Sequence, residues 1–217
     1  MEIIETEVKK TPSQNAWRSL YSCEDAMSAL LTNKERQTLL HIARVSIESA
    51  VKGNPQPTLE KDTLTPALRE NGASFVTLTI NGELRGCIGA LEAYQPLAED
   101  VCEHAVAAAL NDPRFPALRE AELSRIQIEV SYLTKPQELQ YSTSQDLLAK
   151  LHPHLDGVIL KYGRRRATFL PQVWEKLPKP EEFLSQLCYK MGERQTLWQE
   201  TKLQVYVYQV EEFHELN

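Results

Sequence analysis

The chain lacks the patterns that would place it in several large functional classes. Its 217 residues contain no apolar run that approaches the ~20 residues of a membrane-spanning helix. They contain neither a phosphate-binding P-loop nor a Gly-x-Gly-x-x-Gly nucleotide fingerprint. The histidines form no His-x-x-x-His pair. The sequence therefore predicts no metal site and identifies no cofactor.

Cysteine is scarce and scattered. Cys23, Cys87, Cys102 and Cys188 lie far apart without a Cys-x-x-Cys pair, a spacing typical of neither a zinc site nor a dense disulfide framework. The N-terminus, Met1–Glu5, is acidic and lacks the apolar segment of a signal peptide. We therefore expect a cytoplasmic protein with reduced thiols.

Positive charge is also limited. The 24 Lys and Arg residues against 30 Asp and Glu residues give a net charge of −6. A general nucleic-acid binder, or a protein that docks on an anionic membrane, needs a basic face, so we expect neither partner. The basic run Arg164-Arg165-Arg166 is interpreted as a solvated hairpin tip, with a phosphate or partner contact as the alternative.

Hydrophobic periodicity predicts helices mixed with antiparallel hairpins. The first 31 residues have weak periodicity and are interpreted as an N-terminal extension, with a short helix around Glu24–Leu31. A capping box at Thr32–Glu35 predicts the start of the next helix. Further helices are expected near 96–111, 142–151 and 180–191, and strands near 75–80, 83–89, 126–133, 157–162, 166–170 and 202–210. This mixture predicts an α+β fold with mainly antiparallel sheets flanked by helices.

The most informative stretch surrounds the Asn81-Gly82 pair, which is the strongest short hairpin signal because both turn residues need positive φ. A two-residue turn would make cross-strand partners of Ile80 and Glu83, of Leu78 and Arg85, and of Val76 and Cys87. Arg85 and Cys87 would then lie on the apolar face. An arginine there is costly unless it is paired or lines a cleft.

Cys87 is the first candidate for chemistry. A neighbouring arginine favours the thiolate, which is the nucleophilic form, and glycine-flanked amides nearby could bind an oxyanion. The alternative is a small buried hydrophobic residue. His104 is the candidate base, because its spacing from Leu97, Val101 and Ala108 puts it on the apolar face of its helix. A core histidine bonded to backbone is the simpler interpretation.

Two further segments carry candidate polar groups. Glu129 lies on the polar side of its strand with Gln127 and Ser131, where it could pair with Arg85, act as an acid or base, or be solvated. Asp112 and Arg114 follow a helix and are interpreted as a capping turn, although Arg114 could reach an anionic ligand.

The hexapeptide Leu84-Arg85-Gly86-Cys87-Ile88-Gly89 resembles the signature of the AMMECR domain family, whose bacterial and archaeal members are called AmmeMemoRadiSam system protein A. Similarity extends over roughly residues 32–213 and includes segments that follow in the family's order. These are Asn111–Pro116, Ile128–Ser131, Asp156–Leu160, Leu170–Trp174, Glu182–Leu184 and Leu187–Cys188.

The resemblance implies a domain over residues 32–217 with two subdomains, the larger built from both ends of the chain and the smaller from its middle. It implies a ligand site in a cleft between them, lined by Leu84, Arg85, Gly86, Ile88 and Gly89, with Cys87 as a candidate reactive thiol. It also implies a Memo-like protein and a radical SAM protein as partners.

Three hypotheses follow for function. The first is a protein that binds a small molecule or a modified protein residue in the cleft, with or without thiol chemistry. The second is a non-catalytic adapter that binds a protein segment there. The third is a nucleic-acid-associated regulator, which the charge balance disfavours.

Overall fold

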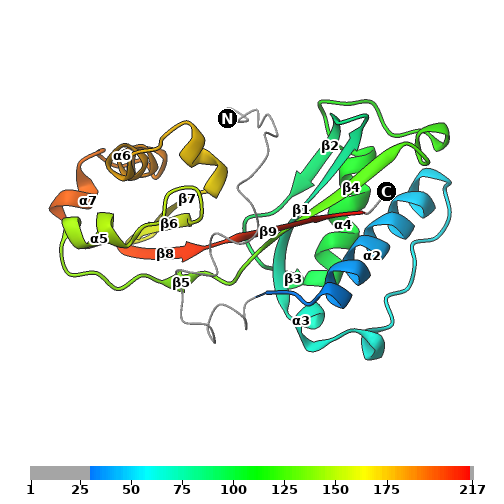
Figure 1. The fold of residues 1–217 in the computed structure, drawn as a ribbon, viewed down its shortest axis with the longest axis horizontal. Coiled ribbons are helices and arrows are strands. Elements are labelled where there is room, and N and C mark those ends of the chain that lie inside the picture. The colour runs from blue at the N-terminus through cyan, green and yellow to red at the C-terminus, as the bar shows by residue number, and fades with distance from the viewer. Residues whose placement is uncertain (1–29, 216–217) are drawn as a thin grey trace. The chain divides into compact units, whose positions relative to one another are not determined.

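The computed structural model describes residues 30–215, which form helices and two sheets (Figure 1). The α+β class predicted from the sequence is confirmed. The described residues divide into two compact units, with residues 30–132 and 212–215 in unit 1 and residues 133–211 in unit 2. The expected helix around Glu24–Leu31 lies, except for its last two residues, outside the described part of the chain.

Unit 1 contains a five-stranded sheet of order β2-β1-β4-β9, with β3 paired to β1. Its strands are β1 (Asn71–Ile80), β2 (Glu83–Gly89), β3 (Gln95–Pro96), β4 (Ile126–Leu133) and β9 (Val210–His214). β1 and β2 form the predicted hairpin, and β4 has the bounds that its alternating sequence predicts.

The helices of unit 1 lie on one side of this sheet (Figure 1). They are α2 (Asn33–Val51), α3 (Pro66–Arg69) and α4 (Leu97–Leu110), with short 3₁₀ turns at Lys61–Thr63 and Glu120–Glu122. The predicted capping box is confirmed, since the Glu35 amide donates to the Thr32 hydroxyl and the Thr32 amide donates to the Glu35 carboxylate. α4 packs directly against β1 and β2, and α2 packs against α4. None of the helices described within residues 30–215 is long and apolar enough to cross a membrane.

Unit 2 contains a four-stranded sheet of order β5-β8-β6-β7. The strands are β5 (Gln137–Glu138), β6 (Gly157–Tyr162), β7 (Arg165–Phe169) and β8 (Gln204–Tyr208), and the helices are α5 (Ser144–Lys150), α6 (Pro180–Lys190) and α7 (Leu197–Glu200), with a 3₁₀ turn at Pro171–Glu175. The core includes Trp174 stacked on Phe183 with ring centroids 3.7 Å apart. The predicted β6–β7 hairpin is confirmed, and Gly163 supplies its positive φ of 59°.

Two details of the predicted strands are wrong. The strand expected over 202–210 corresponds to β8, and β9 was not predicted. The two strands are separated at Gln209, whose amide donates to the Thr134 hydroxyl. The register of the first hairpin also changes within β2. Asn81 and Gly82 have φ of 54° and 83°, and Ile80 pairs with Glu83 as expected.

The change of register is a β-bulge at Arg85. Thr79 pairs with Leu84, but the next pair is Leu78 with Gly86, so Arg85 has no partner on β1. Beyond the bulge Cys87 pairs with Thr77, whereas the sequence predicted Val76. Because side chains alternate along a strand, this slip of one residue moves Cys87 to the opposite face of the sheet.

Candidate functional site

The Cys87 side chain lies on the face of the unit 1 sheet opposite α2 and α4. Val76 and Leu78 are buried in the core that those helices cover, so Thr77, which lies between them, points the other way together with its partner Cys87. On β4, Ile128 and Val130 belong to the same core. Glu129 therefore shares the face of Cys87. We call the surface formed by Thr77, Cys87 and Glu129 the Cys87 face.

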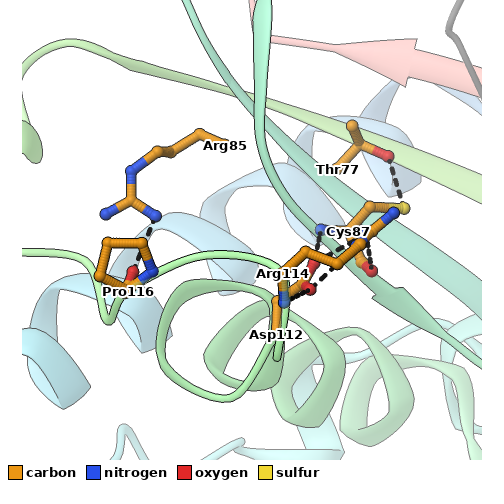
Figure 2. A network of polar contacts seen from close by, with 6 residues as sticks. All are labelled: Thr77, Arg85, Cys87, Asp112, Arg114 and Pro116. Carbon is orange, nitrogen blue, oxygen red and sulfur yellow. Dashed lines mark hydrogen bonds and ion pairs between the residues drawn. The ribbon is translucent and has the colours of Figure 1, made fainter.

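A buried carboxylate holds the backbone of Cys87 in place. The Asp112 side chain, only 2% exposed, accepts a 2.8 Å hydrogen bond from the Cys87 amide, and the Arg114 guanidinium donates a 3.1 Å hydrogen bond to the Cys87 carbonyl (Figure 2). Both bonds occur on the side of β2 that has no strand neighbour. Asp112 and Arg114 thus bind the backbone N–H and C=O groups that the edge strand β2 would otherwise leave unpaired at Cys87.

Asp112 and Arg114 also bind each other. Arg114 donates to Asp112 through its backbone amide, through Nε at 3.0 Å and through Nη2 at 2.7 Å. Burial opposes ionisation of Asp112, but the hydrogen bonds from Arg114 and from the Cys87 amide outweigh it and hold the pKa at about 2. The capping turn predicted here is present, and it has the additional role of fixing β2 to the end of α4.

The environment of Cys87 keeps its thiol protonated. The Thr77 hydroxyl donates to Sγ over 3.3 Å (Figure 2). Burial raises the pKa of Cys87, the Asp112 and Glu129 carboxylates raise it further, and Thr77 and Arg114 only partly oppose the rise. A protonated thiol is a weak nucleophile at neutral pH. The local charges therefore do not produce the thiolate that Arg85 was expected to stabilise.

On the Cys87 face, the carboxyl group of Glu129 remains available as a hydrogen-bond acceptor. It is half-buried and makes no hydrogen bond or ion pair with the described residues. Burial raises its pKa, the nearby Glu212 raises it further, and His214 partly opposes the shift. Glu212 and His214 flank the core residue Phe213 on β9, so they point to the same face.

The glycines of the signature allow close packing on both faces of β2. A Cβ atom on Gly86 would lie 2.1 Å from the carbonyl oxygen of Ala108 on α4. A Cβ atom on Gly89 would lie 2.4 Å from the Phe75 ring. Gly86 and Ile88 face the helices, so they lie on the side of β2 opposite the Cys87 face. Leu84 and Gly89 lie on the same face as Cys87.

Arg85 binds a different carboxylate from the one the sequence suggested. Its Nε and Nη2 donate to the two oxygens of Glu122 at 2.9 and 3.2 Å, and Nη1 donates to the Pro116 carbonyl at 2.9 Å. In Figure 2 its guanidinium points toward Pro116 and away from the group around Cys87. The pairing with Glu129 was wrong, because the bulge directs Arg85 toward the loop that follows α4.

His104 lies on the other side of the sheet from the Cys87 thiol. Its Nδ1 is 3.1 Å from an Asp100 oxygen that also accepts a 2.6 Å hydrogen bond from Ser74, and all three side chains are buried on the side of the helices. His104 is therefore not a neighbour of the Cys87 thiol. It is a core histidine, as the simpler interpretation had it, but its partner is the Asp100 carboxylate rather than backbone.

Sequence reasoning missed Thr77 and underestimated Asp112 and Arg114. The signal that could have found them is the Asp112-Pro113-Arg114 turn directly after α4. From the sequence, the Asp112 carboxylate was expected to bind only the backbone amides of its own turn. No local pattern indicates Thr77, because its position opposite Cys87 depends on the bulge. Across residues 30–215, no three His, Cys, Asp or Glu side chains gather closely enough to hold a metal ion.

Comparison with known proteins agrees with this architecture. The AMMECR1 family model matches residues 40–213. A protein of Methanothermobacter thermautotrophicus is 38% identical over 192 residues, which cover 86% of this chain and 97% of that relative. A protein of Methanocaldococcus jannaschii is 34% identical over 194 residues, with 86% and 93% covered. The crystal structure of the uncharacterised protein PH0010 from Pyrococcus horikoshii matches with a TM-score of 0.66 and 32% identity, covering 85% of this chain and 93% of that one.

Fold and site together define an α+β protein of two units, in which a glycine-rich hairpin presents a cysteine on one face of the larger sheet. The family model and these relatives make the assignment specific: the chain belongs to the AMMECR1 family. The resemblance found in the signature hexapeptide is thereby confirmed.

Proposed function

We propose that this AMMECR1-family protein binds, on the Cys87 face, a small molecule or a modified protein residue that carries an amine or another hydrogen-bond donor. The observation that supports this most is Glu129. Its carboxyl is half-buried and makes no hydrogen bond or ion pair to residues 30–215, so its oxygens are available to accept from a ligand donor. Perturbed carboxyls of this kind are typical of functional sites.

The charge of the face favours the same kind of ligand. The positive charge of Arg114 is already matched by Asp112, which its guanidinium binds through two nitrogens. Glu129 then adds a further carboxyl group to the face. A cationic group is attracted by this balance, whereas a carboxylate or phosphate ligand would be repelled.

Binding fits the geometry better than thiol catalysis. The thiol keeps its proton, and the histidine expected to act as its base lies across the sheet. In this proposal Cys87 lines the site and contacts the ligand, and Glu129 recognises the donor group. The resemblance to the AmmeMemoRadiSam system further suggests a cytoplasmic protein that presents the bound group to a Memo-like and a radical SAM partner.

The proposal can be tested with n-butylammonium, a mimic of a lysine side chain, added to the ¹⁵N-labelled full chain at constant ionic strength. We expect saturable shifts of the Thr77, Cys87 and Glu129 amides. Glu129→Gln should abolish them, while Glu120→Gln, which removes one exposed carboxylate elsewhere in unit 1, should retain them. Equal shifts in the two variants, or no saturable shift in the unmodified chain, would contradict the proposal.

A further inference from the structure

An aromatic side chain lies beside the Cys87 face. Phe75 precedes Thr77 by two residues on β1, so its side chain points to the same side of the sheet as Thr77 and Cys87. The intervening Val76 is fully buried under the helices, whereas Phe75 is only half-buried. Its neighbours on this side, Thr77, Cys87 and Glu129, all carry polar groups. A large apolar side chain next to them therefore needs an explanation.

A glycine of the signature hexapeptide makes room for the Phe75 ring. Phe75 pairs with Gly89 on β2, and a Cβ atom on Gly89 would lie 2.4 Å from both Cγ and Cδ1 of the ring. The ring therefore lies across the Gly89 backbone, in space that any other residue would fill with its own Cβ atom. Such a pairing of an aromatic residue with a glycine fixes the ring on the sheet. Part of the ring stays exposed, because Phe75 is only half-buried.

The exposed part of the ring has no aromatic or cationic partner in the described chain. Rings elsewhere in residues 30–215 contact a lysine or arginine, as Phe115 does with the Arg114 guanidinium at 5.5 Å. No such cation and no second ring lies against Phe75 within the same residues. The ring thus offers an apolar surface that also attracts positive charge.

The strand order separates the Phe75 ring from Glu129 by a short span. The ring lies over β2, whereas Glu129 starts from β4, on the other side of β1. Neighbouring strands are about 4.8 Å apart, so the two positions are roughly 10 Å apart across the sheet. The Glu129 carboxylate is near enough to Cys87 to raise the pKa of its thiol, so the Glu129 side chain shortens that span. A short aliphatic chain can bridge the rest.

We infer that the ligand group recognised here is an alkylammonium, such as a lysine side chain, whose hydrocarbon chain packs on the Phe75 ring while its N–H groups donate to Glu129. This inference rests on the function proposed above and adds the apolar half of the ligand. Each methylene group that leaves water for the ring adds to the affinity. A compact amine reaches only the carboxyl group. If the ring served only to cover Gly89, chain length would have no effect.

The test compares n-butylammonium with methylammonium, each titrated into the ¹⁵N-labelled full chain at constant ionic strength. Both amines carry the same charge and the same three N–H donors, so they differ only in the hydrocarbon chain. We expect n-butylammonium to bind about five- to tenfold more tightly, the effect of partly burying three methylene groups. Phe75→Ala should bring the two affinities together by weakening n-butylammonium binding alone.

Two further variants are the controls. Phe75→Tyr keeps the ring and its contact with Gly89, so it should retain the preference for the longer amine. Tyr94→Ala removes an exposed aromatic side chain elsewhere in unit 1 and should leave the preference unchanged.

The outcomes separate this inference from the proposed function. Equal affinities for the two amines in the unmodified chain, with binding still lost in Glu129→Gln, would overturn the role of Phe75 and leave the proposed function in place. A preference for n-butylammonium that persists in Phe75→Ala would overturn that role as well. Absence of saturable binding of either amine to the unmodified chain would overturn both proposals.

Discussion

Substitution of Gly86 by alanine should damage unit 1 more than its single added methyl group suggests. The new Cβ would lie 2.1 Å from the Ala108 carbonyl oxygen, and ordinary Cβ contacts begin at 3.4 Å. The two groups must separate by roughly 1.3 Å to reach that limit. The obstructing atom belongs to the α4 backbone, so relief requires β2 to move away from the helix.

The expected loss is about 1–3 kcal/mol, the usual cost of overpacking a well-packed core. With a urea dependence of about 1–3 kcal/mol per molar, the unfolding midpoint should fall by about 1 M. The same displacement of β2 should lengthen the hydrogen bond from the Cys87 amide to Asp112. Hydrogen exchange of the Cys87 amide should therefore accelerate together with the loss of stability.

Cys87→Ser is the control for this experiment, because serine is close to cysteine in size and leaves the backbone contact with α4 unchanged. Its midpoint should fall by less than that of Gly86→Ala. Equal midpoints for the two variants, with unchanged exchange at residue 87, would refute the close packing of Gly86 against Ala108 as the reason for glycine in the signature.

Three other predictions follow from the contacts of the site. Asp112 has a pKa of about 2 against 3.8 when unperturbed, so its ionisation should contribute about 2 kcal/mol above pH 4 that is lost as the pH falls toward 2. Asp112→Asn should flatten that part of a plot of urea midpoint against pH. Arg85→Lys loses the two-point contact with Glu122 and should destabilise unit 1 by about 1–3 kcal/mol in urea unfolding, while Arg85→Lys with Glu122→Gln should show a non-additive loss. Thr77→Val removes a hydrogen bond that lowers the pKa of Cys87, so alkylation of the thiol at pH 7 should become slower.

Local features of the hairpin could be predicted from the sequence because they depend on neighbouring residues. Asn81-Gly82 determines the turn through its positive φ angles, and Ile80 pairs with Glu83 as that turn requires. The capping box at Thr32 is equally local, since both partners lie within four residues. In each case the residues in contact are close together in the sequence.

The candidate site depends on contacts that are distant in sequence, which explains the errors there. The bulge at Arg85 accompanies close packing of Gly86 on α4 and the bond from Arg85 to Glu122, 37 residues away. No local pattern signals either contact. Once the register slips by one residue, Cys87 changes face, His104 is no longer a neighbour of its thiol, and Glu129 becomes one.

The central claim about the Cys87 face is that its thiol stays protonated, so that Glu129 is a recognition group rather than a base. The most direct test is the rate of Cys87 alkylation by iodoacetamide at pH 7 in the full chain and in Glu129→Gln, with Cys102 in the same molecules as the internal reference. Because the Glu129 carboxylate raises the pKa of Cys87, its removal should increase the thiolate fraction and make alkylation faster. Slower alkylation of Cys87 in Glu129→Gln, at an unchanged rate for Cys102, would contradict the claim and identify Glu129 as the base of a catalytic thiol.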